Sequence, residues 1–247
     1  MSSVHIGTAG WSIARDAAER FPAEGSGLER YAAVFDAVEI NSSFHRPHRT
    51  STWERWRDSV PDNFRFSVKI PKHITHELRL VGCDEAIDAF VGEAGVLGGK
   101  LAVWLVQLPP SLALDAEVAA RFFARLAERS QTAIACEPRH ASWFSSEAEE
   151  LLTACRVARV AADPARHDSA DKPGGWKGLQ YWRLHGSPVI YRSSYKDRID
   201  GYADALRSGS ASGAHTWCVF DNTASSAATR DALSMNDRLA RSPFPVD

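Results

Sequence analysis

The sequence predicts an α/β protein built as a single (β/α)8 barrel, in one domain that covers residues 1–247. Three observations support this prediction. Short runs rich in β-branched and aromatic residues recur along the chain, and segments with helical patterning lie between them. The chain has 247 residues, close to the roughly 250 that such a barrel needs. No low-complexity linker divides it.

Eight runs are predicted to be strands, because each is short, apolar and closed by polar, glycine or proline residues. In chain order they cover residues 4–8, 38–41, 64–70, 102–108, 133–137, 157–163, 179–185 and 216–222. Strands that alternate with helices form parallel βα units, so we expect the carboxyl ends of these strands to meet at one end of the barrel.

Helices are predicted between the strands. They cover residues 28–35, 84–91, 116–129, 196–207 and 227–239, and two further helices begin at Ser51 and Ser146. Each of these serines precedes a glutamate by three residues, as in a capping box, and Asp115 precedes the helix at 116–129. Residues 164–178 are rich in Asp, Gly and Pro, so the helix between strands six and seven is expected to be replaced or shortened.

A doubly wound open sheet is the alternative fold. Such sheets bind dinucleotides through a glycine-rich turn after the first strand. Here that turn is Gly7-Thr-Ala-Gly-Trp11, which lacks the full G-x-G-x-x-G pattern. The barrel is therefore the preferred prediction, and no dinucleotide or other cofactor is expected.

The composition is that of a folded protein, with 44% hydrophobic residues, 24% charged residues and a formal net charge of -2. The longest strongly apolar run, residues 101–106, is far shorter than the roughly 20 residues of a membrane-spanning helix. The first five residues show neither a basic segment nor an apolar stretch, so we expect a cytoplasmic protein with no membrane partner.

The four cysteines, Cys83, Cys136, Cys155 and Cys218, are scattered singly along the chain. None belongs to a C-x-x-C pair or lies at zinc-finger spacing from a histidine. We therefore expect free thiols rather than a disulfide framework or a structural metal site.

Polar side chains gather near the carboxyl ends of the predicted strands. Alternation places Glu39 and Asn41 on the strand face opposite to Val38 and Ile40, and the other strands follow the same pattern. Because barrel enzymes keep their active sites at these ends, we expect the following residues to converge on one mouth: Glu39, Asn41, Lys69, Gln107, Glu137, Arg139, Asp163, Arg183, His185 and Asp221. Burying a charged side chain is unfavourable unless it has a partner of opposite charge or binds a ligand, so this cluster points to a network or a site.

Seven segments occur in order along the chain: Ile6-Gly-Thr-Ala-Gly-Trp11, Val38-Glu-Ile-Asn-Ser-Ser-Phe44, Phe66-Ser-Val-Lys69 with Ile74-Thr-His76, Gln107-Leu-Pro-Pro-Ser111, Glu137-Pro-Arg139 with Ser142-Trp143, Tyr181-Trp-Arg-Leu-His-Gly186 and Phe220-Asp-Asn-Thr223. Together they resemble the YecE-like family, a domain of unknown function with the number 72. The resemblance covers nearly the whole chain and implies a single TIM barrel. It implies no reaction, because the family has no established activity.

Two departures from the family pattern affect the mouth. Phe44-His45-Arg46 stands where the family more often shows Phe-Tyr-Arg, and Asp221 stands where Asn is common. The first changes an aromatic contact at the rim. The second adds a carboxylate, and with it a further candidate base or metal ligand.

The preferred function is that of an enzyme or binder, for example a hydrolase or lyase, for a small anionic ligand that carries phosphate or carboxylate. The candidate catalytic residues are Glu39, Glu137, His185 and Lys69: the two carboxylates divide the acid and base roles, and the histidine carries protons near pH 7. The candidate ligand-binding residues are Trp11, Asn41, Gln107, Arg139, Asp163, Arg183, Asp221 and Asn222. Asn222 belongs to this set because phosphate can bind at the start of a final helix.

Three alternatives remain open at this point. The charged residues can form an internal salt-bridge network with a purely structural role, in which the polar side chains at the carboxyl ends of the strands pair with one another. A metal-dependent phosphoester hydrolase would use Glu39, Glu137, His185 and Asp221 as ligands, but Lys69 has the same inward parity and opposes a cation.

The third alternative is a non-catalytic, nucleic-acid-binding barrel. Its basic rim would consist of Arg46, His48, Arg49, Lys72, His73, His76 and Arg79, and Trp11, Trp143 and Tyr191 would stack on bases. The acidic net charge makes this the less favoured function, and a steep fall of affinity with salt would support it.

These residue patterns predict that the purified protein carries no stoichiometric transition metal, because cationic side chains share the face of the candidate ligands. Elemental analysis of protein purified without chelators tests this. A content of about one Zn, Mn or Fe per chain would contradict it and favour the metal-dependent hydrolase.

Overall fold

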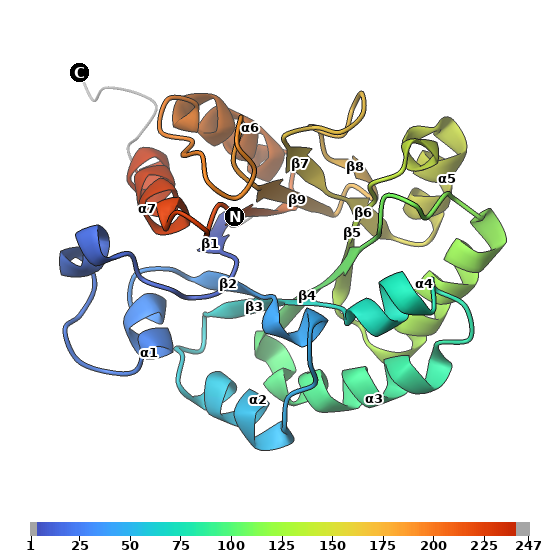
Figure 1. Ribbon diagram of the computed structural model, residues 1–247, viewed down its shortest axis with the longest axis horizontal. Helices are drawn as coiled ribbons and strands as arrows, with labels where there is room; N and C mark the ends of the chain where they lie inside the picture. The colour runs from blue at the N-terminus through green and yellow to red at the C-terminus, as the bar shows by residue number, and fades with distance from the viewer. Residues whose placement is uncertain (1–3, 241–247) are drawn as a thin grey trace.

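The computed structural model describes residues 4–240 as an α/β fold with strands at the centre and helices around them (Figure 1). The strands form two sheets. The first sheet has the order β1-β10-β9-β7, and the second has the order β2-β3-β4-β5-β6-β8. Every pairing is parallel except the short one between β6 and β8.

The bounds of the strands follow the sequence prediction closely at the carboxyl ends. The first sheet contains β1 (Val4–Thr8), β10 (His215–Phe220), β9 (Leu179–Leu184) and β7 (Ala161–Asp163). The second contains β2 (Ala37–Ile40), β3 (Arg65–Lys69), β4 (Leu101–Gln107), β5 (Ala133–Glu137), β6 (Val157–Arg159) and β8 (Gly174–Gly175).

Two links join the sheets. Ala9, directly after β1, forms an isolated parallel bridge with Glu39 of β2, and the Gly10 N–H donates to the Glu39 carbonyl oxygen at 2.8 Å. At the other junction, β6 and β7 are successive pieces of the predicted strand 157–163. The Val160 N–H between them donates to the Cys136 carbonyl oxygen at 2.8 Å. The single predicted strand is therefore wrong in this detail, because the segment changes partner from β5 to β9 along its length.

The helices lie around the outside of the strands (Figure 1). They are α1 (Gly27–Ala32), α2 (Thr50–Asp58), α3 (Asp84–Ala94), α4 (Ala116–Arg129), α5 (Ser146–Ala154), α6 (Ile199–Ala211) and α7 (Ala227–Ala240). In α4 the buried residues Ala119, Phe122, Phe123 and Leu126 recur at the spacing of one helical face. Within residues 4–240 no helix is long and apolar enough to cross a membrane.

One of the three predicted helix caps is confirmed. The Asp115 carboxylate accepts from the Val118 N–H at 3.0 Å at the start of α4. The predicted start of a helix at Ser146 is confirmed, but Ser146 is the first residue of α5 rather than its cap, and Ser51 is the second residue of α2 rather than its cap. At α5 the hydroxyl oxygen of Ser145 accepts instead, from the Ala148 N–H at 3.2 Å.

Short helical turns fill several connections. They are η1 (Arg15–Arg20), η2 (Ser42–Phe44), the π-helical η3 (His73–Glu77), η4 (Gly95–Lys100) and η5 (Ala141–Phe144). Within the described chain, residues 164–178 contain no helix, only the two-residue β8, as the sequence predicts. The turns η2 and η3 follow β2 and β3 and therefore lie beside the carboxyl ends of those strands.

Two apolar clusters divide the interior. The larger one packs the helices against the strands, for example through Phe66, Trp104 and Phe122. The smaller one consists of strand residues of the opposite parity: Ala37, Val103, Leu105, Ala135, Ala158, Val160, Leu179, Tyr181, Trp217 and Val219. These residues share their strand face with the polar side chains at the carboxyl ends, so the inward face is apolar below and polar at the mouth.

The close approach of β1 to β2 predicts that Gly7→Ala destabilises the protein. A Cβ atom on Gly7 would lie 2.3 Å from the Ala37 carbonyl oxygen, so the junction of the two sheets would have to move. We expect a loss of about 2–3 kcal/mol in the free energy of unfolding, measured by urea denaturation.

The matched control is Gly201→Ala on α6, where a Cβ would meet no atom within 4 Å. This change should stabilise the helix by about 0.5–1 kcal/mol. Equal stability of Gly7→Ala and the wild type would contradict the tight junction.

Candidate functional site

Arg183 on β9 is the centre of the polar mouth. Its side chain is fully buried, and its guanidinium binds the Glu39 carboxylate with two hydrogen bonds, Nε to Oε2 at 2.9 Å and Nη2 to Oε1 at 2.7 Å. The same guanidinium donates from Nη1 to Glu137 Oε2 at 2.5 Å and from Nη2 to Asp221 Oδ2 at 3.0 Å. Burial opposes the charged guanidinium, but the attraction of three carboxylates prevails and raises the pKa of Arg183.

Glu39 on β2 is the partner that binds Arg183 through both carboxylate oxygens. Tyr181 Oη is 2.9 Å from Glu39 Oε2 and 2.8 Å from Ser67 Oγ. Since a carboxylate can only accept, the phenol donates to Glu39 and accepts from the Ser67 hydroxyl. Glu39 is fully buried and both its oxygens are occupied, so it holds Arg183 in place and has no free atom for a ligand.

His185 lies between two carboxylates at the rim of the network. Its Nδ1 is 2.9 Å from Asp221 Oδ2, and its Nε2 is 3.2 Å from Glu137 Oε1. Both ring nitrogens therefore face acceptors, which favours the doubly protonated imidazolium. Burial opposes that charge, but the attraction of Glu137 and the hydrogen bonds to both carboxylates raise the pKa of His185.

Glu137 collects the largest number of donors at the mouth. Besides Arg183 and His185, its Oε1 accepts from Gln107 Nε2 at 3.0 Å and from Arg139 Nη2 at 3.1 Å. Burial raises the pKa of a carboxyl group, but the nearby cations prevail and hold the pKa of Glu137 well below its usual value. The same balance lowers the pKa of Asp221, so both groups are carboxylates at neutral pH.

Lys69 at the end of β3 differs from its neighbours, because its ammonium forms no hydrogen bond or ion pair within residues 4–240. It is 8% exposed, and Nζ lies 3.9 Å from the centroid of the Phe44 ring, a cation–π contact. Burial, followed by repulsion from Arg183, lowers the pKa of Lys69 to about 8. The attraction of the carboxylates only partly opposes this shift.

Two predicted ligand-binding residues lie outside this network. Asp163 turns toward α6, where its carboxylate accepts from Arg198 Nη1 at 2.9 Å and from Tyr202 Oη at 2.7 Å. Asn222 is buried and donates from Nδ2 to the Ser193 carbonyl oxygen at 2.9 Å and to Asp231. The Asp163 carboxylate thus pairs with residues of α6 and of the loop before it, and within residues 4–240 it forms no hydrogen bond or ion pair with Arg183 or its carboxylate partners.

The aromatic candidates for stacking have different positions. Trp11 packs on the edge of Trp56, with ring centroids 5.2 Å apart. Trp143 is 1% exposed and donates from Nε1 to the Leu112 carbonyl oxygen at 3.0 Å. Trp143 is therefore not available to stack on a base, whereas Tyr191 is 41% exposed.

Asn41 lies just past β2. Its Oδ1 is buried and has no hydrogen-bond partner in the described part of the chain. A buried acceptor without a partner is unfavourable by about 1–3 kcal/mol.

The mouth has no arrangement for a metal ion. No group of three or more His, Cys, Asp or Glu side chains within residues 4–240 is placed to hold one. Arg183 occupies the position between Glu39, Glu137 and Asp221 that a cation would need. His73 is bound to Glu77, at 2.8 Å from Nδ1 to Oε2.

Sequence reasoning did not select Tyr181, Ser67 or Phe44 as site residues. Tyr181 and Ser67 lie on the same strand faces as Arg183 and Lys69, so the alternation of side chains along the strands could have predicted that they join the site. Phe44 lies in the η2 turn, where no strand periodicity applies, and its place under Lys69 depends on the path of the chain after β2.

A family model described as protein of unknown function DUF72 matches residues 5–246. The chain belongs to this family. It is 33% identical over 82 residues to the UPF0759 protein YecE of Escherichia coli (strain K12), covering 33% of this chain and 30% of YecE. It is 30% identical over 150 residues to the UPF0759 protein YunF of Bacillus subtilis (strain 168), covering 58% of this chain and 52% of YunF. The chain thus spans about a third to a half of these relatives.

Solved structures of DUF72 proteins share the fold along nearly the whole chain. A DUF72 family protein from Enterococcus faecalis V583 has a TM-score of 0.79 at 20% identity, covering 99% of this chain and 100% of that one. One from Thermotoga maritima MSB8 has a TM-score of 0.77 at 22% identity, covering 96% and 99%. A xylose isomerase-like TIM barrel/4-hydroxyphenylpyruvate dioxygenase fusion protein is similar at a TM-score of 0.53 and 13% identity, covering 95% and 42%.

We predict that Arg183→Met destabilises this DUF72 protein by about 3–5 kcal/mol, because it leaves the buried Glu39 carboxylate without its cation. The free energy of unfolding from urea denaturation measures this loss. The control is Arg20→Met, which removes an exposed ion pair with Asp237 and should cost less than about 1 kcal/mol. Similar losses for the two variants would mean that the Arg183 network contributes little to the fold.

Proposed function

We propose that this protein binds a small anion that carries phosphate or carboxylate, at the carboxyl ends of its strands, and acts on it by acid–base chemistry. The observation that carries the proposal is Lys69, whose side chain is largely buried, at 8% exposed, and whose ammonium has no hydrogen bond or ion pair in the described chain. A buried charge is costly unless it is compensated, and an anionic ligand supplies that compensation. The other charged groups of the network already have partners.

The charge balance of the mouth also supports an anion. Three carboxylates, Glu39, Glu137 and Asp221, are opposed by the cations Arg183, Arg139, Lys69 and the imidazolium of His185. The cluster therefore carries one net positive charge while Lys69 and His185 are protonated. A charge of this sign in a site walled by protein attracts anions.

The roles follow from access and protonation. Lys69, with a pKa of about 8, holds the anion and can donate or accept a proton near neutral pH. Glu137 and Asp221 stay ionised and orient the His185 imidazolium, which borders a small hollow together with Arg139 and Tyr191. Glu39 acts only through Arg183. The catalytic set proposed here is therefore Lys69 and His185, supported by Glu137.

We also propose that the two sheets form one (β/α)8 barrel, in a single domain that covers residues 1–247. The bridge between Ala9 and Glu39 and the shared segment β6–β7 support a closed ring of strands. The likeness to a xylose isomerase-like TIM barrel supports the same architecture. In such barrels the carboxyl ends of the strands are where ligands bind.

Lys69→Met tests the function. The variant loses a charge-assisted contact, so its affinity for sulfate should fall roughly tenfold to a hundredfold in calorimetric titrations. Without ligand, the variant should be more stable than the wild type at pH 7 by up to about 3 kcal/mol, because a lysine whose folded pKa is about 8 is buried at a cost.

The pH dependence has a definite sign. The folded pKa of Lys69 is lowered to about 8, so its positive charge, and with it the affinity of the wild type for sulfate, should decrease as pH rises through about 8. Lys177→Met, at an exposed lysine in the loop before β9, is the control and should bind like the wild type. Destabilisation by Lys69→Met, together with no sulfate binding to the wild type, would refute the proposal.

A further inference from the structure

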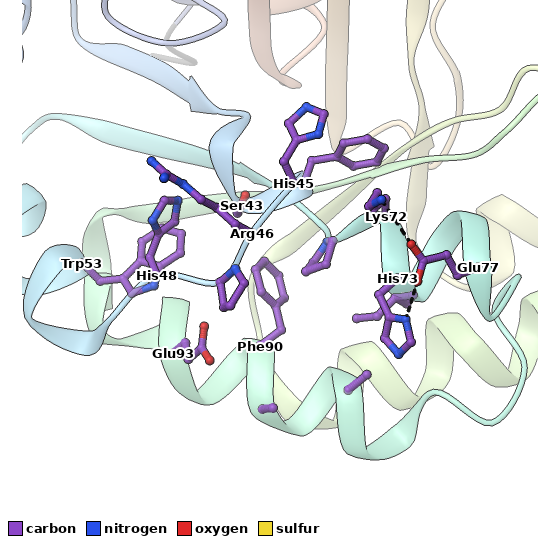
Figure 2. A pocket seen from close by; sticks show the side chains of 16 residues that line it. Ser43, His45, Arg46, His48, Trp53, Lys72, His73, Glu77, Phe90 and Glu93 are labelled. Atoms are coloured by element: carbon purple, nitrogen blue, oxygen red, sulfur yellow. Dashed lines mark hydrogen bonds and ion pairs between the residues drawn. The ribbon is translucent and has the colours of Figure 1, made fainter.

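A second pocket lies next to the mouth, between the connection from β2 to α2 and the helix α3 (Figure 2). Its volume is about 410 Å³, within the range of small-molecule sites. The helix contributes Ala86, Ala89, Phe90 and Glu93, which recur on one face of α3. Two alanines in this wall leave open the space that larger side chains would fill.

The pocket walls are mainly apolar and aromatic. Phe44, Trp53 and Phe90 provide rings, and Ile74, Pro47 and Pro71 complete the apolar lining. Flat apolar walls of this kind fit a planar ring, because aromatic groups pack well edge-to-face or offset.

The lining holds two acidic residues, Glu77 and Glu93, and two basic ones, Arg46 and Lys72. Glu77 binds Lys72 at 3.3 Å and His73 at 2.8 Å, as the dashed lines in Figure 2 mark. In Figure 2 the side chains of His45 and Arg46 point away from α3. Glu93 places a carboxylate on α3, so the space along this helix disfavours an anionic group and suits an uncharged one.

One hydrogen-bond donor in the wall lacks an acceptor. Trp53 is fully buried, and its indole Nε1 has no hydrogen-bond partner in the described part of the chain. A buried donor without a partner costs about 1–3 kcal/mol.

Phe44 connects this pocket to the anion site. Its ring forms part of the pocket lining, and its centroid is only 3.9 Å from Lys69 Nζ. A ligand ring packed against Phe44 would have its centroid about 4.5–7 Å from that of Phe44. A short link from such a ring is enough to bring an anionic group to Lys69.

We propose that the ligand of this protein is a planar, uncharged ring system joined to an anionic group, with the ring in the α3 pocket and the anion at Lys69. This inference rests on the proposed anion site and adds the class of the ligand. The ring supplies apolar area that a bare anion lacks, so the two parts together should bind more tightly than either alone.

Three probes test the proposal by calorimetric titration: 1-naphthyl phosphate, which has both parts, inorganic phosphate and 1-naphthol. The first should bind the wild type at least tenfold more tightly than phosphate. Ala86→Trp fills the pocket from the side of α3 and should abolish this gain while it leaves the affinity for inorganic phosphate unchanged. Ala89→Leu is a second, milder variant that should reduce the tighter binding of 1-naphthyl phosphate over phosphate. It replaces Ala86→Trp in the test if that variant fails to fold.

The matched control is Ala124→Trp, an exposed position on α4 beside a different surface hollow, which should change neither affinity. A gain that survives both Ala86→Trp and Ala89→Leu, or no gain at all in the wild type, would overturn the proposal.

The failure of the anion site would give a different pattern. In that case inorganic phosphate would not bind, 1-naphthol and 1-naphthyl phosphate would bind equally, and Lys69→Met would change neither. Such a result would overturn the combined ligand proposed here and the anion site with it. Phosphate binding that depends on Lys69, with no gain from the ring, would overturn only the ring pocket.

Discussion

The bidentate pair between Arg183 and Glu39 is the interaction on which the polar interior depends. Arg183 belongs to the first sheet, whereas Glu39 and Glu137 belong to the second, so one guanidinium holds the two sheets together across their carboxyl ends. All three groups are almost entirely buried. Each would be costly alone, because a buried charge is tolerated only with a hydrogen-bonded partner.

This constraint determines which groups remain for a ligand. Tyr181 binds Glu39 and Ser67, and His185 is held by Asp221 and Glu137. Lys69 forms no ion pair within residues 4–240, and its ammonium lies against the Phe44 ring. A residue whose pKa is strongly shifted beside a cluster of paired charges is a candidate for a functional site. The same Phe44 ring also lines the α3 pocket, so Phe44 lies between that pocket and the proposed anion site at Lys69.

Much of the fold could be predicted because the patterns that encode it are local. Alternation along strands and the spacing of apolar residues in α4 depend only on neighbouring positions, and the ends of β5 and α4 were predicted to the residue. The break at Val160 and the cap at Ser145 were missed. The first depends on pairing with β5 and β9, which are distant in sequence, and the second on a backbone choice between two adjacent serines.

For the candidate site, the sequence by itself determined which side chains face inward at the carboxyl ends, since parity is a property of each strand. Only the tertiary structure decided their partners. It directed Asp163 to Arg198, paired Glu39 with Arg183, and left the Lys69 ammonium against Phe44. Partner choice depends on distances between strands and loops far apart in the chain. No local pattern contains those distances, because they arise only when the two sheets pack together.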